Sequence, residues 1–315
     1  MQPIVLYTAA HAGFPDSEPL GGGKAVADFL ERECPGWTVL SPQAVRGGAA
    51  GTPYRLTELS EWEYARFCRE FEEAVTRRIL EHSPRECVVL SNDISEGPDF
   101  SALGKRGYKV VTIWHVDVVD YFTKFYLRGW VRPETAARWE RWPLPDVLKL
   151  VFRKQAECVR YSRRLVVPSE PMREVILRCY PECAADRIVV VPWGNISAAH
   201  AAATDAVAEA SASEFVIITL SRLSPEKGIE RLLRALPLVR GNYRVLICGA
   251  AAYMSGRRYE RMLRRLTNDR VEFLGHVTGE RKAAILQRAD LFVSASRHES
   301  YGLTIAEAEI GRAHV

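Results

Sequence analysis

Short apolar segments alternate with longer amphipathic ones along this chain of 315 residues. In its first part, segments rich in β-branched residues occur at 4–8, 37–40, 87–90, 110–114, 164–167 and 188–191. Helical patterns separate them, near 24–33, 61–81, 148–161 and 170–179. Because parallel strands need a long crossover between them, this alternation predicts an α/β fold with parallel sheets covered by helices.

A stretch of small and polar residues at 196–213 interrupts the alternation, and we expect a linker or a loosely packed helix there. The pattern then restarts, with strands at 215–220, 243–248, 271–274 and 289–295 and helical segments near 229–239, 258–266 and 280–287. The chain is therefore predicted to hold two Rossmann-like βα domains, residues 1–195 and 214–309, which face each other across a cleft.

Composition excludes several classes of protein. Hydrophobic residues make up 47% and charged residues 26%, which is ordinary for a folded soluble protein, and the net charge of +4 is too small to argue for nucleic acid as a partner. The seven cysteines include no C-x-x-C pair, so we expect reduced thiols and no metal centre. Neither a signal peptide nor a membrane-spanning run occurs, which predicts a cytoplasmic protein.

Two glutamates lie where the strand pattern at 289–295 changes to a helical one near Leu303. Glu299 is expected on the intervening turn and Glu307 on the first helical turns. Such a turn presents backbone N–H groups to an anion and lies at the carboxyl end of a strand, where open α/β sheets bind ligands. We infer an enzyme site here.

A basic loop, Ser221-Arg-Leu-Ser-Pro-Glu-Lys-Gly228, follows the strand at 215–220. Arg222 and Lys227 are two cations that would suit a diphosphate if they project towards the strand ends. A solvated surface loop would have the same sequence. The neighbouring pair of glutamates favours the phosphate interpretation, because both loops end strands of one predicted sheet.

The first domain offers weaker signals. Gly21-Gly22-Gly23 follows the first strand and opens a helix, which suits either an approach to an anion or a simple tight turn, and the Walker pattern is absent. His115 and Asp117 follow the strand at 110–114. A histidine at a strand end is more often structural, but both side chains are expected to point into the cleft.

Aromatic and basic residues interleave between 121 and 154. Such a segment could lie on anionic lipid as a peripheral membrane contact at the inner face. We favour a subdomain that covers the acceptor and packs its aromatic side chains inward, because long insertions after strand ends usually line sites.

These features together resemble a glycosyltransferase of family 4, which has the GT-B fold. The similarity extends over nearly the whole chain: the glycine-rich N-terminal loop, the strand ending in His115, Val166-Val-Pro-Ser169, Ile188-Val-Val-Val-Pro-Trp-Gly-Asn195, Ser221-Arg-Leu-Ser-Pro-Glu-Lys-Gly228, Val271-Glu-Phe-Leu-Gly-His276, and the segment from Ala289 to the two glutamates. The last three motifs in this order are specific.

The resemblance implies retaining transfer of a sugar from a nucleotide-diphosphate sugar to a hydroxyl of a glycan, lipid or small-molecule acceptor. It implies no metal and no other cofactor, because cations and helix-end amides take the charge of the leaving diphosphate. In it, Arg222 and Lys227 hold the diphosphate, Glu307 the ribose hydroxyls, and Glu299 the donor sugar. The backbone amides of Tyr301, Gly302 and Leu303 add to the phosphate site, Gly22 and Gly23 let the first domain approach it, and His115 contacts the sugar or the acceptor.

Residues 310–315 back-translate to a common sequencing adapter, so we expect a non-native tail there and a second domain that is incomplete. An unpaired strand edge would make such a chain poorly soluble, and we expect the chain itself to be inactive.

Two other functions fit the same residues: a nucleotide-sugar 2-epimerase of this fold, and a non-catalytic protein that binds nucleotide sugars or glycans. Fold analogy alone does not separate them from a glycosyltransferase.

Overall fold

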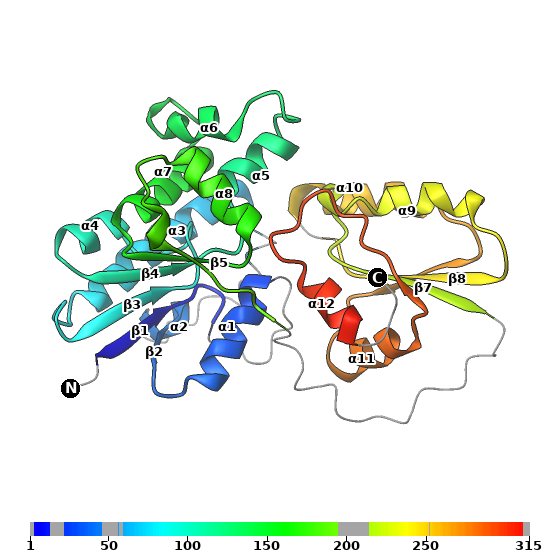
Figure 1. Ribbon diagram of the computed structural model, residues 1–315, viewed down its shortest axis with the longest axis horizontal. Coiled ribbons are helices and arrows are strands. Elements are labelled where there is room, and N and C mark those ends of the chain that lie inside the picture. The colour runs from blue at the N-terminus through cyan, green and yellow to red at the C-terminus, as the bar shows by residue number, and fades with distance from the viewer. Residues whose placement is uncertain are drawn as a thin grey trace. The chain divides into compact units, whose positions relative to one another are not determined.

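The computed structural model describes residues 3–12, 22–45, 56, 59–194, 214–251 and 253–310. The predicted linker at 196–213 and residues 311–315 of the predicted tail lie outside these ranges. The chain divides into two compact units, Met1–Pro192 (unit 1) and Trp193–Val315 (unit 2), close to the predicted end of the first domain at residue 195. Each unit contains a parallel sheet with helices on both faces, as the strand and helix patterns predict (Figure 1).

Unit 1 contains a six-stranded sheet in the order β2-β1-β3-β4-β5-β6, and every neighbouring pair is parallel. Successive side chains of β1 enter different cores: Leu6 packs in the larger one and Tyr7 against α1. Apolar residues on both faces are what a strand buried between two helical layers requires. The strands are β1 (Ile4–Thr8), β2 (Thr38–Leu40), β3 (Cys87–Ser91), β4 (Lys109–Ile113), β5 (Arg164–Val167) and β6 (Ile188–Val190).

The helices of unit 1 include the predicted ones and several short ones that the periodicity does not reveal. Ser60 begins α3 with a capping box, in which its hydroxyl accepts from the Glu63 N–H and the Glu63 carboxylate accepts from the Ser60 N–H. The helices are α1 (Gly22–Glu33), α2 (Pro42–Val45), α3 (Glu61–Ile79), α4 (Phe100–Lys105), α5 (Val118–Phe125), α6 (Pro133–Ala136), α7 (Asp146–Tyr161) and α8 (Glu170–Cys179), with the 3-10 turns η2 (Ala137–Arg141) and η3 (Ala185–Arg187).

Unit 2 contains a four-stranded parallel sheet in the order β10-β7-β8-β9. Helices α9 and α10 cover one face, and α11 and α12 cover the other (Figure 1). The strands are β7 (Phe215–Leu220), β8 (Tyr243–Cys248), β9 (Val271–Gly275) and β10 (Leu291–Phe292); the helices are α9 (Ile229–Ala235), α10 (Tyr253–Arg264), α11 (Gly279–Arg288) and α12 (Leu303–Ile310), with the 3-10 turns η5 (Pro225–Lys227) and η6 (Leu236–Leu238).

Strand β10 is shorter than the pattern at 289–295 predicts. The Val293 N–H still donates to the carbonyl of Ile218 in β7, and the chain then bends towards the loop that follows β7. The Arg297 N–H and the Ser296 hydroxyl both donate to the carbonyl of Glu226. Two strand-end loops of unit 2 are thereby joined through their backbones.

The aromatic segment between 121 and 154 divides into buried and exposed side chains. Phe152 is buried in the core, and Phe122 and Trp139 pack partly against it, as the inward-packing interpretation predicts. The same interpretation is wrong for Tyr126, Trp130 and Trp142, which are exposed. The phenol hydroxyl of tyrosine and the indole N–H of tryptophan can hydrogen-bond with water, so these three side chains can remain at the surface.

All seven cysteines are free thiols, and all except the half-buried Cys34 are buried, in agreement with the predicted reduced state. None of the helices in the described ranges combines the length and apolar character that crossing a bilayer demands.

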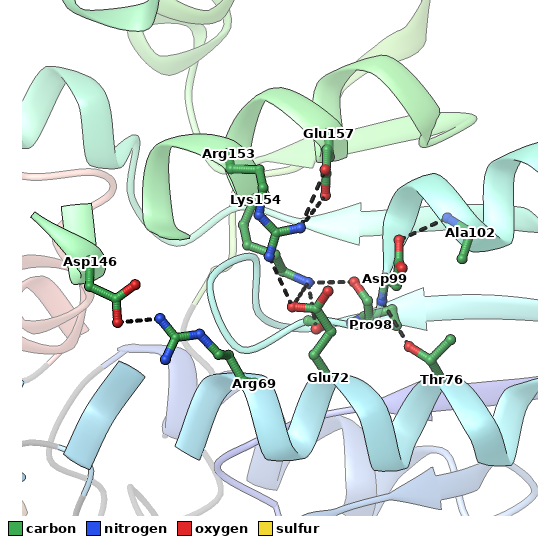
Figure 2. Close-up of polar contacts among 11 residues, drawn as sticks. Arg69, Glu72, Thr76, Pro98, Asp99, Ala102, Asp146, Arg153, Lys154 and Glu157 are labelled. Carbon is green, nitrogen blue, oxygen red and sulfur yellow. Dashed lines mark hydrogen bonds and ion pairs between the residues drawn. The ribbon is translucent and has the colours of Figure 1, made fainter. Parts of the chain in front are cut away.

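A buried cation anchors the loop between β3 and α4. Lys154 of α7 is fully buried, and its ammonium donates to the carbonyls of Gly97 (2.8 Å) and Pro98 (2.5 Å). The Glu72 carboxylate of α3 lies 3.4 Å away, and Arg153 bridges Glu72 to α7 (Figure 2). Burial lowers the pKa of Lys154, and Glu72 opposes this shift. The loop is therefore held by charge-assisted bonds inside a low-dielectric region.

We expect Lys154→Met to lower the free energy of unfolding by about 3 kcal/mol, because it leaves two buried carbonyls unpaired and removes a cation beside Glu72. Urea denaturation followed by circular dichroism measures this. Lys149→Met, on an exposed position of the same helix, is the matched control and should change stability by less than about 0.5 kcal/mol. Equal stabilities of the two variants would contradict the anchoring role.

Candidate functional site

The carboxyl ends of β7 and β10 form the centre of the candidate site in unit 2. Crossovers from β7 lead to β8 on one side, whereas β10 lies on its other side, so the sheet has its topological switch point between β7 and β10. Open α/β sheets bind ligands in the crevice at this point. The loops that carry the predicted cations and glutamates leave from these two strands.

Lys227 and Glu299 meet at the switch point. The Lys227 ammonium donates to Glu299 Oε1 at 2.7 Å, and the two side chains are 14% and 28% exposed. Lys227 ends η5 and Glu299 lies in the loop between β10 and α12, as predicted. A partly shielded ion pair of this kind can exchange one partner for a charged ligand.

The loop after β7 is organised by a buried carboxylate. Glu226 is 6% exposed, accepts from the Ser224 hydroxyl at 2.6 Å, and lies 3.7 Å from the guanidinium of Arg222. Gly228 follows with a φ of +61°, and the carbonyl of Ala295 would lie only 2.2 Å from a Cβ at this position. The close approach of the two loops thus requires glycine at residue 228.

The turn into α12 is fixed at both ends. The Tyr301 hydroxyl accepts from the Gly194 N–H at 3.1 Å, and Gly302 has a φ of +87° immediately before the helix. Glu307, on α12, accepts from Lys282 of α11 at 2.9 Å. The predicted glutamates therefore belong to two separate ion pairs, Glu299 with Lys227 and Glu307 with Lys282.

Two hollows adjoin Glu299. A space of about 550 Å³ extends along β10 and is lined by Leu291–Ser294, Ser296–Glu299 and Ile305. A much smaller one, about 10 Å³, lies between the ends of β7 and β10, where Lys227 and Thr304 line it. The smaller one lies at the switch point, which makes it the better marker of the site.

A second polar cluster lies at the switch point of unit 1, between β1 and β3. His115 Nε2 lies 3.3 Å from Asn92 Oδ1, Asn92 donates to the carbonyl of Gly23 at 3.2 Å, and Asp93 accepts from the Ala10 N–H at 2.8 Å. His11 lies 3.9 Å from Asp93.

Gly23 lies at the centre of this cluster. A Cβ at Gly23 would lie 3.5 Å from the His115 ring and 3.7 Å from the His11 ring. Gly22 begins α1 beside it. The predicted glycines and the predicted histidine are therefore neighbours within unit 1.

Burial determines the charges of this cluster. It raises the pKa of Asp93 from 3.8 to about 6, against the opposing effect of His11. It lowers the pKa of His115 from 6.5 to about 4, and His11 adds to this effect. His115 is consequently neutral at neutral pH, so it can exchange hydrogen bonds with hydroxyls but cannot act as a fixed cation.

Asp117 does not face a ligand-binding cleft, and that prediction is wrong. It is the N-cap of α5, 2% exposed, and its Oδ1 accepts from the Asp120 N–H (2.8 Å) and from Gln155 (3.1 Å). Its Oδ2 has no hydrogen-bond partner among the described residues. Two residues beyond His115, the chain has already turned inward to start a helix, and capping determines the role of Asp117.

Several polar residues at these sites were missed from the sequence. In unit 1 they are His11, Asn92 and Asp93, which lie within three residues of the carboxyl ends of β1 and β3. His115 and Glu299 were selected because they follow the carboxyl ends of strands. The same criterion selects these three residues once the order of the strands is known. Glu226 was missed because a glutamate in a polar loop gives no sign of burial.

We expect Gly228→Ala to destabilise unit 2 by more than about 3 kcal/mol, because a methyl group there adds a clash with Ala295 to the cost of a left-handed backbone. Gly241→Ala is the matched control, since its φ is +99° and nothing lies within 4 Å of the added Cβ. It should cost only about 1–2 kcal/mol. Thermal unfolding of both variants measures the difference, and similar losses would refute the close contact between the loops.

We expect Asp117→Asn to gain stability relative to the parent chain as pH rises. Burial raises the pKa of Asp117 from 3.8 to about 6. The protonated carboxyl therefore contributes to the free energy of unfolding at acidic pH, and this contribution is lost as pH rises through 6. The asparagine does not titrate. The difference in unfolding free energy should grow by roughly 2 kcal/mol between pH 4 and pH 7, as measured by urea denaturation. A difference that stays constant with pH would contradict the buried carboxyl.

Comparison with known proteins adds sequence relatives. The family model described as "Glycosyl transferases group 1" matches residues 203–309. An uncharacterized glycosyltransferase of Methanocaldococcus jannaschii is 34% identical over 100 residues, which are 30% of this chain and 25% of that protein. A GDP-mannose-dependent monoacylated alpha-(1-6)-phosphatidylinositol monomannoside mannosyltransferase of Corynebacterium glutamicum is 36% identical over 96 residues, 29% of this chain and 24% of the relative. The matched part thus spans only about a quarter of these relatives.

Solved structures match the fold over 99% of this chain. Anabaena HepE, in complex with UDP and glucose, has a TM-score of 0.62 at 15% identity, with 79% of its chain covered. Sucrose-phosphate synthase of Thermosynechococcus elongatus has a TM-score of 0.69 at 17% identity, with 80% covered. Residues 203–309 therefore match the glycosyltransferase group 1 model, and the chain has the two Rossmann-like domains of the GT-B fold.

Proposed function

We propose that the whole protein is a retaining glycosyltransferase, which moves a hexosyl group from a nucleotide-diphosphate sugar to a hydroxyl of a glycan, lipid or small-molecule acceptor. The observation that carries this proposal is the Lys227–Glu299 ion pair at the switch point of unit 2, next to the start of α12. It combines a cation for a diphosphate and a carboxylate for a sugar in one place.

The diphosphate is proposed to bind at Lys227 and Arg222 and at the backbone amides of Tyr301, Gly302 and Leu303. The first N–H groups of a helix have no partner within the helix, and the helix dipole favours an anion there. Fixed cations and amides stabilise the charge that develops on the leaving diphosphate. The transfer then needs no metal.

The ion pair also suggests how Glu299 is delivered to the sugar. A bound diphosphate offers Lys227 a stronger partner than one carboxylate does, so Lys227 turns to the phosphate oxygens. Glu299 is then available to accept from donor sugar hydroxyls and to stabilise positive charge at the anomeric carbon. Lys282 orients Glu307, and because a carboxylate can accept several hydrogen bonds, Glu307 can also receive the ribose hydroxyls.

The reaction proposed is a single exchange at the anomeric carbon. The bond from this carbon to the phosphate oxygen breaks, the acceptor oxygen bonds to the same face, and the acceptor proton passes to an oxygen of the leaving diphosphate. His115, neutral and held by Asn92, hydrogen-bonds the sugar or the acceptor in this proposal, and Gly22 and Gly23 leave room beside it.

The names of related proteins agree with the donor class. The mannosyltransferase relative depends on GDP-mannose, and the HepE structure holds UDP and glucose. Nucleotide-diphosphate hexoses are the class common to both. Thermal-shift measurements with UDP-, GDP- and ADP-sugars test the donor, because a ligand that binds the folded state raises its melting temperature. No shift with any of them would count against the proposal.

Two variants separate binding from transfer. Lys227→Ala should weaken binding of the nucleotide diphosphate by roughly 10–100-fold, measured by calorimetry, because it removes a charge-assisted bond. Glu299→Gln should retain that binding and lower transfer by about 100-fold or more, measured as release of the nucleotide diphosphate in the presence of acceptor.

Arg244→Ala is the control for both variants, since Arg244 pairs with Glu214 and Glu272 at the opposite end of β8. It should leave binding and transfer unchanged. If Glu299→Gln leaves transfer intact, the proposed role of Glu299 is wrong. Release of a free epimerised sugar without acceptor would instead indicate a 2-epimerase.

A further inference from the structure

The segment between α5 and α7 presents large aromatic side chains to solvent. Trp130 is 89% exposed, Tyr126 67% and Trp142 60%. They come from neighbouring elements, because α6 contacts both α5 and η2. Exposed indole and phenol rings gathered in one region mark an interaction surface more often than a solvated one.

The acidic residues of this segment are already paired with arginines from outside it: Glu134 with Arg178, Glu140 with Arg160, and Asp146 with Arg69. Among the exposed cations of residues 121–154, Lys124 pairs with Asp120, but four others have no such partner. Arg128, Arg132, Arg138 and Lys149 form no ion pair with any residue in the described ranges. The surface around the exposed rings is therefore positively charged.

The loop from Leu127 to Arg132 has a fixed shape. Arg128 and Gly129 both have left-handed backbones, with φ of +52° and +74°, which turns the chain sharply after α5. The Gly129 N–H donates to the carbonyl of Thr123 at 2.8 Å, and the Trp130 N–H to that of Leu127 at 2.9 Å. The loop is thus tied to the end of α5, and Trp130 is held outward on its tip.

Trp142 stands on a second support. Its ring stacks on that of Trp139 at a centroid distance of 6.1 Å, and Trp139 packs partly against the core. The half-buried Trp139 ring supports the exposed Trp142 ring. The exposed Trp142 indole therefore loses little conformational freedom when it binds a partner.

We propose that this aromatic-basic patch, made of Tyr126, Arg128, Trp130, Arg132, Arg138 and Trp142, docks unit 1 on the surface of an anionic phospholipid bilayer. Indole and phenol rings prefer the interface between headgroups and acyl chains, and arginines beside them attract anionic headgroups. Single-stranded nucleic acid would require stacking faces along a basic groove, whereas Trp130 stands on a loop tip. This inference is independent of the proposed function, because docking requires neither donor nor acceptor.

Flotation with lipid vesicles tests the proposal on the full chain, without sugar substrates. Vesicles contain phosphatidylcholine alone or with one third phosphatidylglycerol, and flotation separates bound protein from aggregates that sediment. We expect the protein to float with the anionic vesicles only, and the bound fraction to fall steeply as salt rises from 50 to 500 mM.

Two variants assign the binding to the patch. Arg128→Ala/Arg132→Ala should weaken it about 25-fold, since each cation near such a surface contributes roughly fivefold. Trp130→Ala should weaken it on the order of tenfold and leave the salt dependence in place. The matched control for the cations is Arg85→Ala/Lys109→Ala, because both residues are exposed and lie at the amino ends of β3 and β4. The matched control for Trp130 is Trp62→Ala, another exposed indole of unit 1.

The proposal is overturned if the protein fails to float with anionic vesicles or floats equally with neutral ones. It is also overturned if the control variants lose as much binding as the patch variants. Binding to a single-stranded oligonucleotide with no flotation would identify nucleic acid, not lipid, as the partner of this surface.

Discussion

The direction in which the chain leaves β1 and β7 is the constraint on which both candidate sites depend. Each is the first strand of its unit in chain order and has a neighbouring strand on both sides. The chain connections to these two neighbours run in opposite directions along the sheet. A crevice must open where these crossovers separate, at the carboxyl ends of the strands. Polar groups there can be partly buried without blocking the packing of the sheet. The His11, Asn92, Asp93 and His115 cluster of unit 1 and the Lys227–Glu299 pair of unit 2 both use this position.

Helix α7 supports the loops that carry the polar cluster of unit 1. Adjacent residues of α7 reach two different strand-end loops: Lys154 holds the loop after β3 through Gly97 and Pro98, and Gln155 accepts from the Val118 N–H after β4. Neither side chain belongs to the cluster. They hold the loops that carry Asn92 and His115, and a site needs support of this kind to keep its groups in place.

Periodicity predicted the strands closely, because buried parallel strands require continuous apolar runs that few other structures tolerate. It also placed Glu299 on a turn and the start of α12 at Leu303. It missed α2, α4, α5 and α6, which have at most eight residues each, and it extended β10 beyond Phe292. The order of the strands was not readable from the sequence, so His11 and Asp93 could not be joined to His115. Asp117 was misassigned because the sequence does not distinguish a helix cap from a group that faces a ligand.

Backbone atoms make several of the contacts between the two strand-end loops of unit 2, beside the Lys227–Glu299 ion pair. Arg297 donates through its N–H, Glu226 accepts through its carbonyl, and Gly228 admits the carbonyl of Ala295 because it has no side chain. Contacts of this kind do not depend on which side chains the loops carry. Substitutions at a position such as 295 can therefore accumulate during evolution while the spacing between the two loop backbones is preserved. A donor site of this kind can change its preference for a sugar while the backbone geometry of its loops stays the same.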